Sequence, residues 1–341
     1  MNFKNKSILI TGGTGSFGTR FVKRILDDTD CSRLVVFSRD ELKQYQLLEQ
    51  LKISNKEDID KNRLRFFIGD VRDSKRLDMA MKNIDYVVHA AALKQVPAAE
   101  YNPMECIKTN VLGAQNVIDA CISNNVEKVV ALSTDKAANP INLYGATKLA
   151  ADKLFTAANN ISGSENLKFS VVRYGNVFGS RGSVVPLFLH LRDQKVDSYP
   201  ITDKRMTRFW ITLDEGVDFV LQTFERMNGG EIFVPKIPSV NILDVLKAVD
   251  ENAEFKEVGI RPGEKLHEVM CPVDESHKVI EFNDYYLIPP SIQFFADEMD
   301  YLTANNKEKG SHVDDGFEYN SHENSRYLSV DEIKNYINNF L

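Results

Sequence analysis

The first half of the chain alternates short apolar runs with longer amphipathic segments. Runs rich in β-branched and aromatic residues predict strands at 7–11, 33–38, 64–69, 86–91, 128–133 and 169–177. Segments with helical spacing lie between them, at 17–28, 40–53, 74–82, 105–124 and 144–158. Strands that alternate with helices favour a parallel sheet covered on both faces, and near-continuous apolar strands fit that burial. We therefore expect an α/β fold with a doubly wound parallel sheet.

The alternation fades near residue 178, and prolines punctuate shorter elements from Pro186 onward. We expect one domain over 1–178, to which segments of the C-terminal half could return. The remainder, 179–341, should form a smaller domain and a C-terminal tail. Such a domain usually covers the open end of the sheet and supplies ligand contacts. The polar segment 51–63 is expected to be an exposed helix end or loop, and a capping box of Ser329 and Glu332 predicts a last helix from residue 330.

Charge and composition narrow the classes of function. The net charge of −7 disfavours nonspecific binding to nucleic acid. The 4 cysteines are not spaced like a metal clip or redox pair, so we expect reduced thiols and no metal. The apolar run at 7–10 is too short for a signal peptide, and no stretch approaches the roughly 20 apolar residues of a membrane span. These features indicate a soluble cytoplasmic protein.

A glycine-rich loop, TGGTGSFG at 11–18, follows the first predicted strand and precedes a helix. Glycines at this spacing permit the tight turn and let the backbone approach a pyrophosphate, which the helix N-terminus then binds. The strand and helix on either side distinguish it from an ordinary glycine-rich turn. This pattern predicts a Rossmann-type dinucleotide site. Its candidate contacts are Gly12, Gly15, Ser16, Phe17 and Gly18.

The end of the second strand, FSRDELK, bears on the choice between NAD and NADP. An acid about 20 residues beyond the glycines would hold the ribose 2′-hydroxyl of NAD. Here Ser38, Arg39 and Lys43 offer donors that suit a 2′-phosphate, so we expect NADP. Asp40 leaves two alternatives open, because it could reach the ribose or cap the next helix.

Two further strand ends supply cofactor candidates. Asp70 and Val71 close the third strand, where an acid can accept a hydrogen bond from the adenine amino group. Ala90 lies in HAAA at the end of the fourth, where small residues let the dinucleotide lie close. We assign no role to the histidine of that motif.

The stretch STDKAANPINLYGATK, at 133–148, carries the candidate chemistry. Tyr144 and Lys148 are four residues apart and would share one face of a helix. A tyrosine has a reference pKa of about 10, and an adjacent ammonium and a positive nicotinamide both favour the phenolate that a base requires. Upstream, Asp135 and Lys136 place an acid beside a base at the carboxyl end of a central strand, where ligands gather.

At these motifs the chain resembles the extended short-chain dehydrogenases/reductases. The resemblance rests on TGGTGSFG (11–18), GDV (69–71), HAAA (89–92), Asn110 in KTNVLG, STDK (133–136) and YGATK (144–148). It continues through RYGNVFGSRGSVVP (173–186), MTRFW (206–210) and RPGEKLHE (261–268), which look like the inverting UDP-N-acetylglucosamine 4,6-dehydratases. Many related dehydratases carry Asp-Glu in place of Asp135-Lys136, so the lysine selects the inverting subgroup over the retaining one.

The resemblance implies a division of labour. Tyr144 and Lys148 would serve oxidation at C4, while Asp135 and Lys136 serve C6 and C5, and Asn110 belongs to the cofactor site. The implied substrate is UDP-N-acetylglucosamine, and its candidate contacts are Lys94, Asn176, Arg208 and Arg261. The implied product is a UDP-4-keto-6-deoxy sugar for a surface polysaccharide or glycan. The family suggests a homo-oligomer, with a hexamer among its forms.

Two alternatives remain at this stage. A nucleotide-sugar 4-epimerase or reductase needs the tyrosine and lysine but no C5 base, so Lys136 argues against it. A noncatalytic NADP-binding sensor could keep the glycine loop and lose Tyr144 and Lys148, yet both are present.

Overall fold

A ten-stranded sheet forms the centre of the molecule, with the strand order β16-β14-β15-β10-β6-β5-β4-β1-β2-β3. The computed structural model describes residues 3–53, 63–163, 166–180, 182–294 and 299–340. The strands are β1 (Ser7–Thr11), β2 (Arg33–Ser38), β3 (Leu64–Ile68), β4 (Tyr86–His89), β5 (Lys128–Thr134), β6 (Lys168–Tyr174), β10 (Ile232–Pro235), β14 (Ile280–Glu281), β15 (Tyr285–Ile288) and β16 (Ser311–His312). The neighbouring strands β10, β6, β5, β4, β1, β2 and β3 run parallel to one another. Strands β15, β14 and β16 are added to the β10 edge in antiparallel pairs. The order around β1 is that of a doubly wound dinucleotide-binding sheet, which confirms the expected fold class.

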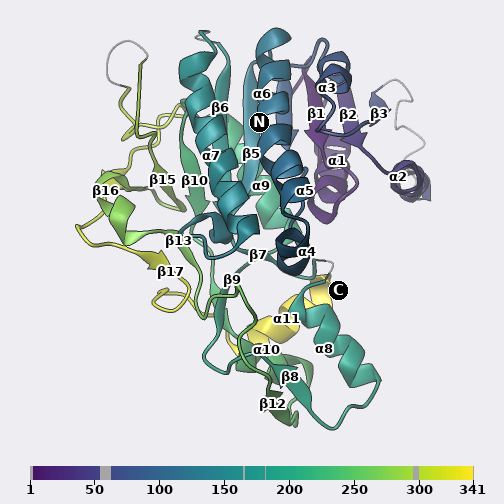
Figure 1. Cartoon of the computed structure of the whole chain (residues 1–341), viewed down its shortest axis with the longest axis vertical. Helices are drawn as coiled ribbons and strands as arrows, with labels where there is room; N and C mark the ends of the chain where they lie inside the picture. Colours follow the sequence, from purple (N-terminus) through teal and green to yellow (C-terminus); the bar gives the residue numbers. More distant parts are fainter. Residues whose placement is uncertain (1–2, 54–62, 164–165, 181, 295–298, 341) are drawn as a thin grey trace.

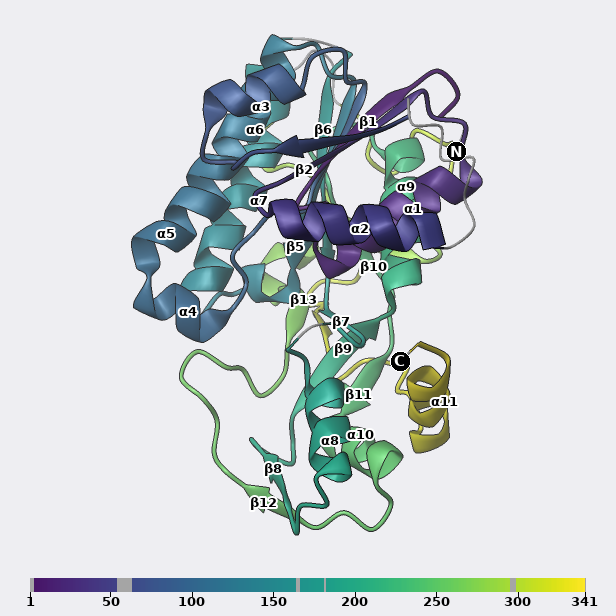
Figure 2. The same ribbon diagram turned by 90° about the vertical axis from the view of Figure 1, so that its right-hand side faces the viewer.

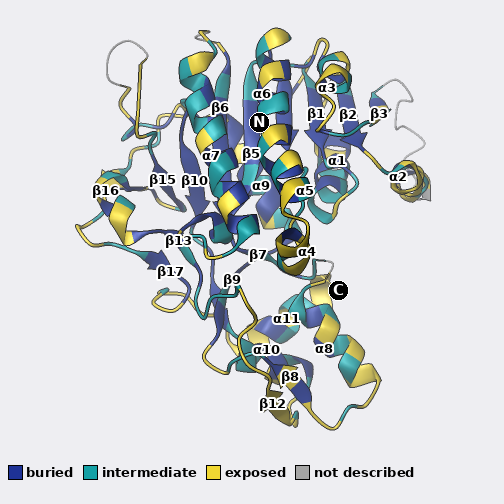
Figure 3. Cartoon of the chain, viewed as in Figure 1, coloured by how far each residue is buried: buried dark blue, intermediate teal, exposed yellow. Residues whose placement is uncertain are grey.

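Helices cover both faces of this sheet (Figures 1 and 2). One face carries α1 (Ser16–Asp28), α2 (Glu41–Ile53) and α9 (Leu213–Arg226). The other carries α3 (Ser74–Ala80), α4 (Val96–Tyr101), α5 (Pro103–Ile107), α6 (Gly113–Ser123) and α7 (Leu143–Ile161). The central strands are buried and the helices expose mainly their outer sides (Figure 3), so the main core lies between the layers.

A smaller region with its own apolar core lies beyond the carboxyl ends of the parallel strands (Figure 1). It contains the sheet β11-β9-β7 and the pair β12-β8. The bounds are β7 (Asn176–Val177), α8 (Val184–Asp193), β8 (Tyr199–Ile201), β9 (Thr207–Ile211), β11 (Ser239–Asn241), α10 (Ile242–Val249), β12 (Phe255–Glu257) and α11 (Val330–Phe340). A further pair, β13 (Val269–Cys271) with β17 (Tyr319–Asn320), connects the two regions. The division of the chain at residue 178 stays a prediction, and β10, β14, β15 and β16 lie in the large sheet.

The sequence-based boundaries are wrong in two informative places. The strand expected at 169–177 breaks at Gly175, where a Cβ would lie 2.5 Å from that of Phe209, so β7 leaves the large sheet and pairs with β9. The helix expected at 105–124 is divided by a π-helical turn over Lys108–Leu112. The sequence also gave no sign of α4. Most of the polar segment at 51–63 lies outside the described residues.

The C-terminal helix begins with the expected capping box. The Ser329 amide donates to the Glu332 carboxylate at 2.8 Å, and the Glu332 amide donates to the Ser329 hydroxyl at 3.2 Å. All four cysteines are buried and unbridged. Within the described residues, no helix is long and apolar enough to span a membrane.

Candidate active site

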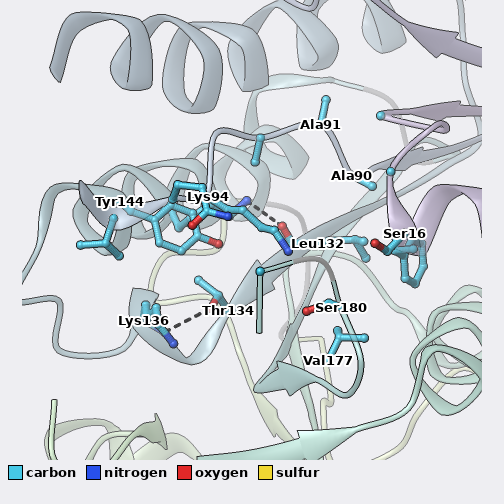
Figure 4. A pocket seen from close by; sticks show the side chains of 18 of the residues that line it. Ser16, Ala90, Ala91, Lys94, Leu132, Thr134, Lys136, Tyr144, Val177 and Ser180 are labelled. Carbon is cyan, nitrogen blue, oxygen red and sulfur yellow. Dashed lines mark hydrogen bonds between the residues drawn. The ribbon is translucent and has the colours of Figure 1, made fainter. Parts of the chain in front are cut away.

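A cavity of about 710 Å³ lies where the parallel strands end and the smaller region begins. All of the cofactor candidates except Asn110 line it, as do the four substrate candidates. Of the catalytic candidates, Lys136, Tyr144 and Lys148 reach its wall. Figure 4 shows Lys94, Tyr144 and Lys136 on one side, and Ser16 and Ala90 on the other. The structure therefore brings residues from distant parts of the chain into one site.

The glycine loop forms a cradle that only glycine permits. Gly12 has a φ of +67°, and a Cβ there would lie 2.9 Å from the backbone of Ala91. A Cβ on Gly18 would lie 2.5 Å from the Gly12 carbonyl oxygen. Gly15 caps α1 without a side chain, so no side chain blocks the N–H groups of the first turn. The loop fits the pyrophosphate of a dinucleotide.

The end of β2 places two cations at the cavity. Arg39 lies 3.8 Å from Asp70 and keeps a half-exposed side chain, and Lys43 lies 3.1 Å from Asp40. Asp40 accepts a hydrogen bond from the Lys43 amide at 3.0 Å, so its carboxylate caps α2. Ser38 is buried and accepts a hydrogen bond from Gln44 at 2.9 Å. Of the two alternatives for Asp40, the geometry supports the cap.

Two other cofactor candidates are occupied by protein contacts. Asp70 pairs with Arg72 at 2.7 Å; burial raises the pKa of the carboxyl, but the Arg72 hydrogen bonds outweigh it and the net pKa is lowered. Asn110 is buried in the π-helical turn, where its amide donates to the Leu93 carbonyl at 2.9 Å and accepts from the Leu93 amide at 2.8 Å. Asn110 thus shapes the loop after β4 from behind the wall.

Tyr144 and Lys148 begin α7, whose cap, Asn142, accepts from the Gly145 amide at 2.8 Å. Burial raises the pKa of Tyr144 to about 12, while the charge of Lys136 lowers it. Lys148 donates to the Leu132 carbonyl at 2.6 Å, and burial lowers its pKa. From the sequence we expected the Lys148 ammonium to lower the pKa of the Tyr144 phenol. In the structure, the cation that lowers the pKa of the phenol is Lys136.

Asp135 and Lys136 form a 3₁₀ turn directly after β5. Asp135 is fully buried and accepts from the Thr134 hydroxyl at 2.8 Å and from the Lys136 ammonium at 3.1 Å. Its second oxygen has no hydrogen-bond partner among the described residues. The ammonium also lies 3.0 Å from the buried carboxylate of Glu268. Burial lowers the pKa of Lys136, but the two carboxylates outweigh it and the net pKa is raised.

Glu268 is the site residue that sequence reasoning missed. It ends the motif RPGEKLHE, in which only Arg261 was given a role. The one available signal was an acid at the end of a motif shared with dehydratases.

The substrate candidates differ in how far protein contacts already occupy their side chains. Arg208 donates to the carbonyls of Lys265 and Leu266, each at 3.0 Å, so its guanidinium mainly holds the loop before β13. Arg261 is exposed at the cavity rim, and Asn176 lines the cavity from β7. Burial and the charge of Lys136 lower the pKa of Lys94. Arg261 is therefore the more available arginine for a phosphate.

Comparisons with known proteins identify the family of the chain. Residues 8–290 match a family model described as "Polysaccharide biosynthesis protein". A UDP-N-acetylglucosamine 4,6-dehydratase (inverting) from Campylobacter jejuni is 56% identical over 336 residues, 98% of each chain. A UDP-glucose 4-epimerase from Rickettsia felis is 42% identical over 97% of this chain and 95% of its own.

Solved structures give the same picture of the fold. Pen from Bacillus thuringiensis superposes with a TM-score of 0.86 at 38% identity and covers 99% of both chains. A dTDP-glucose 4,6-dehydratase from Streptomyces venezuelae, solved with NAD, has a TM-score of 0.66 at 21% identity over 76% of this chain and 86% of its own. The second likeness supports the fold alone.

Proposed function

The chain belongs to the polysaccharide biosynthesis protein family of extended short-chain dehydrogenases/reductases, and we propose that it is an NADP-dependent UDP-N-acetylglucosamine 4,6-dehydratase that inverts C5. Such an enzyme is a hydro-lyase. The observation that carries the proposal is the Asp135-Lys136 pair beside Tyr144, in a chain 56% identical to an inverting dehydratase over 98% of its length.

The glycine cradle would hold the pyrophosphate of the cofactor, and Arg39 and Lys43 would bind the 2′-phosphate. Their positions at the cavity, with Asp40 committed to a helix cap, support NADP over NAD. When bound there, a nicotinamide would supply the reversible hydride transfer that the reaction needs at C4 and C6.

Tyr144 removes the proton of the 4-hydroxyl. Its phenol is nearly buried, so it needs positive charge nearby to ionise, and Lys136 supplies that charge. Lys148, held by the Leu132 carbonyl, lines the same cavity as Tyr144.

Lys136 and Asp135 carry out the elimination of water as a coupled pair. The ammonium passes a proton to the Asp135 carboxylate, 3.1 Å away, and becomes a neutral amine. The amine takes the C5 proton. Asp135 does not line the cavity, so its carboxylic acid gives its proton to the departing 6-hydroxyl through the Thr134 hydroxyl, which lines the cavity and lies 2.8 Å from Asp135 Oδ1. Both residues end in their starting charge states and one water is released. The hydride taken from C4 is placed on C6, and a solvent proton, matched by the 4-hydroxyl proton that Tyr144 has removed, adds to C5 from the opposite face and inverts that centre.

The substrate diphosphate would bind chiefly to Arg261, with Lys94 and Asn176 near the sugar. Arg208 supports this surface through the loop carbonyls it binds. A guanidinium is suited to a diphosphate because it can bind two oxygens at once. We further propose that the protein acts in the cytoplasm as a homo-oligomer, a hexamer being the form expected from the family.

A 4-epimerase is the second candidate, favoured by the 42% identity to the Rickettsia felis protein of that name. An epimerase does not need an acid/base pair for C5 and C6, and it leaves substrate mass unchanged. Purified protein should be incubated with UDP-N-acetylglucosamine and the nucleotide-sugar product measured by mass spectrometry. Loss of one water supports the dehydratase, whereas an unchanged mass with a new hexose configuration would replace it with the epimerase.

A further inference from the structure

Two carboxylates, and not Asp135 alone, hold the Lys136 ammonium. Its Nζ lies 3.1 Å from Asp135 Oδ1 and 3.0 Å from Glu268 Oε1. A lysine ammonium has three N–H donors. Two are used by these contacts, which leaves the third for the cavity that Lys136 lines.

Glu268 is buried and is held in place by contacts of its side chain and its backbone. Its side chain is 2% exposed, and Oε1 also lies 3.9 Å from the Arg208 guanidinium. Its Oε2 is buried without a hydrogen-bond partner among the described residues. The Glu268 amide donates to the Ser321 hydroxyl at 2.9 Å, and its carbonyl accepts from the Ser321 amide at 2.8 Å. A carboxylate buried with an unpaired oxygen costs free energy, so the contact with Lys136 and Arg208 must offset that cost.

The charged and titratable groups around Lys136 come from several elements. They are Asp135 in the same turn, Glu268 before β13, Arg208 on β9, Tyr144 on α7, Lys94 after β4 and Lys265 in the loop before β13. Three of these are cations, and they oppose the ammonium. Glu264 pairs with Arg208 at 3.5 Å, so without Glu268 the only carboxylate paired with the Lys136 ammonium among the described residues would be Asp135.

We propose that Glu268 is a positioning residue that anchors Lys136 together with Asp135 and keeps it an ammonium until C4 has been oxidised. The catalytic part of this inference rests on the proposed function. In that reaction Lys136 must be charged while Tyr144 takes the 4-hydroxyl proton, and neutral afterwards, when it takes the C5 proton. Glu268 would keep the lysine in the charged state that the first step requires.

The electrostatic signs agree with this order. Burial lowers the pKa of Lys136, and the two carboxylates raise it by more. The ammonium in turn lowers the pKa of Tyr144, which burial raises to about 12. Loss of the Glu268 charge should therefore make Lys136 neutral at lower pH and leave Tyr144 harder to ionise.

The first test measures the charge on Lys136 without substrate or cofactor. Acetic anhydride modifies only neutral amines, so labelling against pH, followed by mass spectrometry of the Lys136 peptide, gives a midpoint. In Glu268→Gln this midpoint should fall by about one pH unit or more, since an opposite charge at this distance shifts a pKa by that amount. Glu275→Gln is the matched control, because Glu275 pairs with Lys278 outside the cavity.

An unchanged midpoint in folded Glu268→Gln would overturn the inference. If that variant does not fold, Glu268→Asp withdraws the charge by one methylene and should move the midpoint less, but in the same direction; no movement would again overturn it.

The second test follows the two half-reactions against pH in single turnovers with UDP-N-acetylglucosamine. In Glu268→Gln the profile for oxidation at C4 should move to higher pH, and that for C5 proton loss to lower pH. A merely structural role would slow both without opposite shifts, and that result would contradict the inference. If the unaltered protein does not dehydrate the substrate, the proposed function fails, while the labelling test still decides the role of Glu268.

Discussion

Gly145, in the first turn of α7, allows the catalytic turn to pack against the helix that carries Tyr144. A Cβ at this position would lie 2.1 Å from the Lys136 carbonyl oxygen, whereas ordinary contact begins near 3.4 Å. Gly145→Ala must therefore push the two segments apart by about 1.3 Å, the difference between those values. Overpacking of this kind costs about 1–3 kcal/mol, and the helix propensity of alanine returns at most about 1 kcal/mol.

We expect Gly145→Ala to lower the free energy of unfolding by about 2 kcal/mol, because the clash with backbone costs about 3 kcal/mol, the upper end of that range, and helix propensity returns about 1 kcal/mol. Turnover should fall about 100-fold, since a misplacement of about 1 Å in a catalytic group has that effect. Gly216→Ala is the control: Gly216 is in the first turn of α9, and the nearest atom to its Cβ would be 4.0 Å away. It should raise stability by up to about 1 kcal/mol. Urea unfolding and dehydration assays on both variants decide the matter, and a Gly145→Ala protein as stable and active as Gly216→Ala would refute the reasoning.

Three further variants test individual roles. NADP should bind more tightly than NAD, and Arg39→Ala should narrow the difference by roughly 1.5–3 kcal/mol; equal affinities of the unaltered protein would exclude the NADP assignment. Tyr144→Phe should show no nicotinamide absorbance change in a single turnover, and a normal rate would mean that another group takes the 4-hydroxyl proton. Lys136→Ala should show no C5 labelling in deuterated water and no dehydration. Its oxidation step should persist with a pH profile moved upward, since Tyr144 has lost the cation that lowers its pKa; full labelling would show that the C5 base is another residue.

The features predictable from sequence are those that depend on local pattern. Buried parallel strands are continuous apolar runs, so β1 and β2 were predicted at their observed bounds. The glycine loop and the shared face of Tyr144 and Lys148 were also predictable, because the first depends on one short turn and the second on one turn of a helix.

The features that escaped prediction depend on contacts between distant segments. Glu268 reaches Lys136 because β13 and the segment before it pack against the turn after β5, and the motif that ends in Glu268 does not indicate this contact. The break at Gly175 depends on Phe209 in another sheet. The π-helical turn at Asn110 has the same apolar pattern as an α-helix, since the pattern does not distinguish a single widened turn.

The central claim is that this site removes water and inverts C5, and proton NMR of the product tests it most directly. UDP-N-acetylglucosamine should be converted in deuterated water and the sugar ring examined before the product is processed further. The account predicts a 4-keto-6-deoxy ring with deuterium at C5 and the C5 configuration opposite to that of the substrate. A 4-keto-6-deoxy product that retains the substrate configuration at C5 would contradict it.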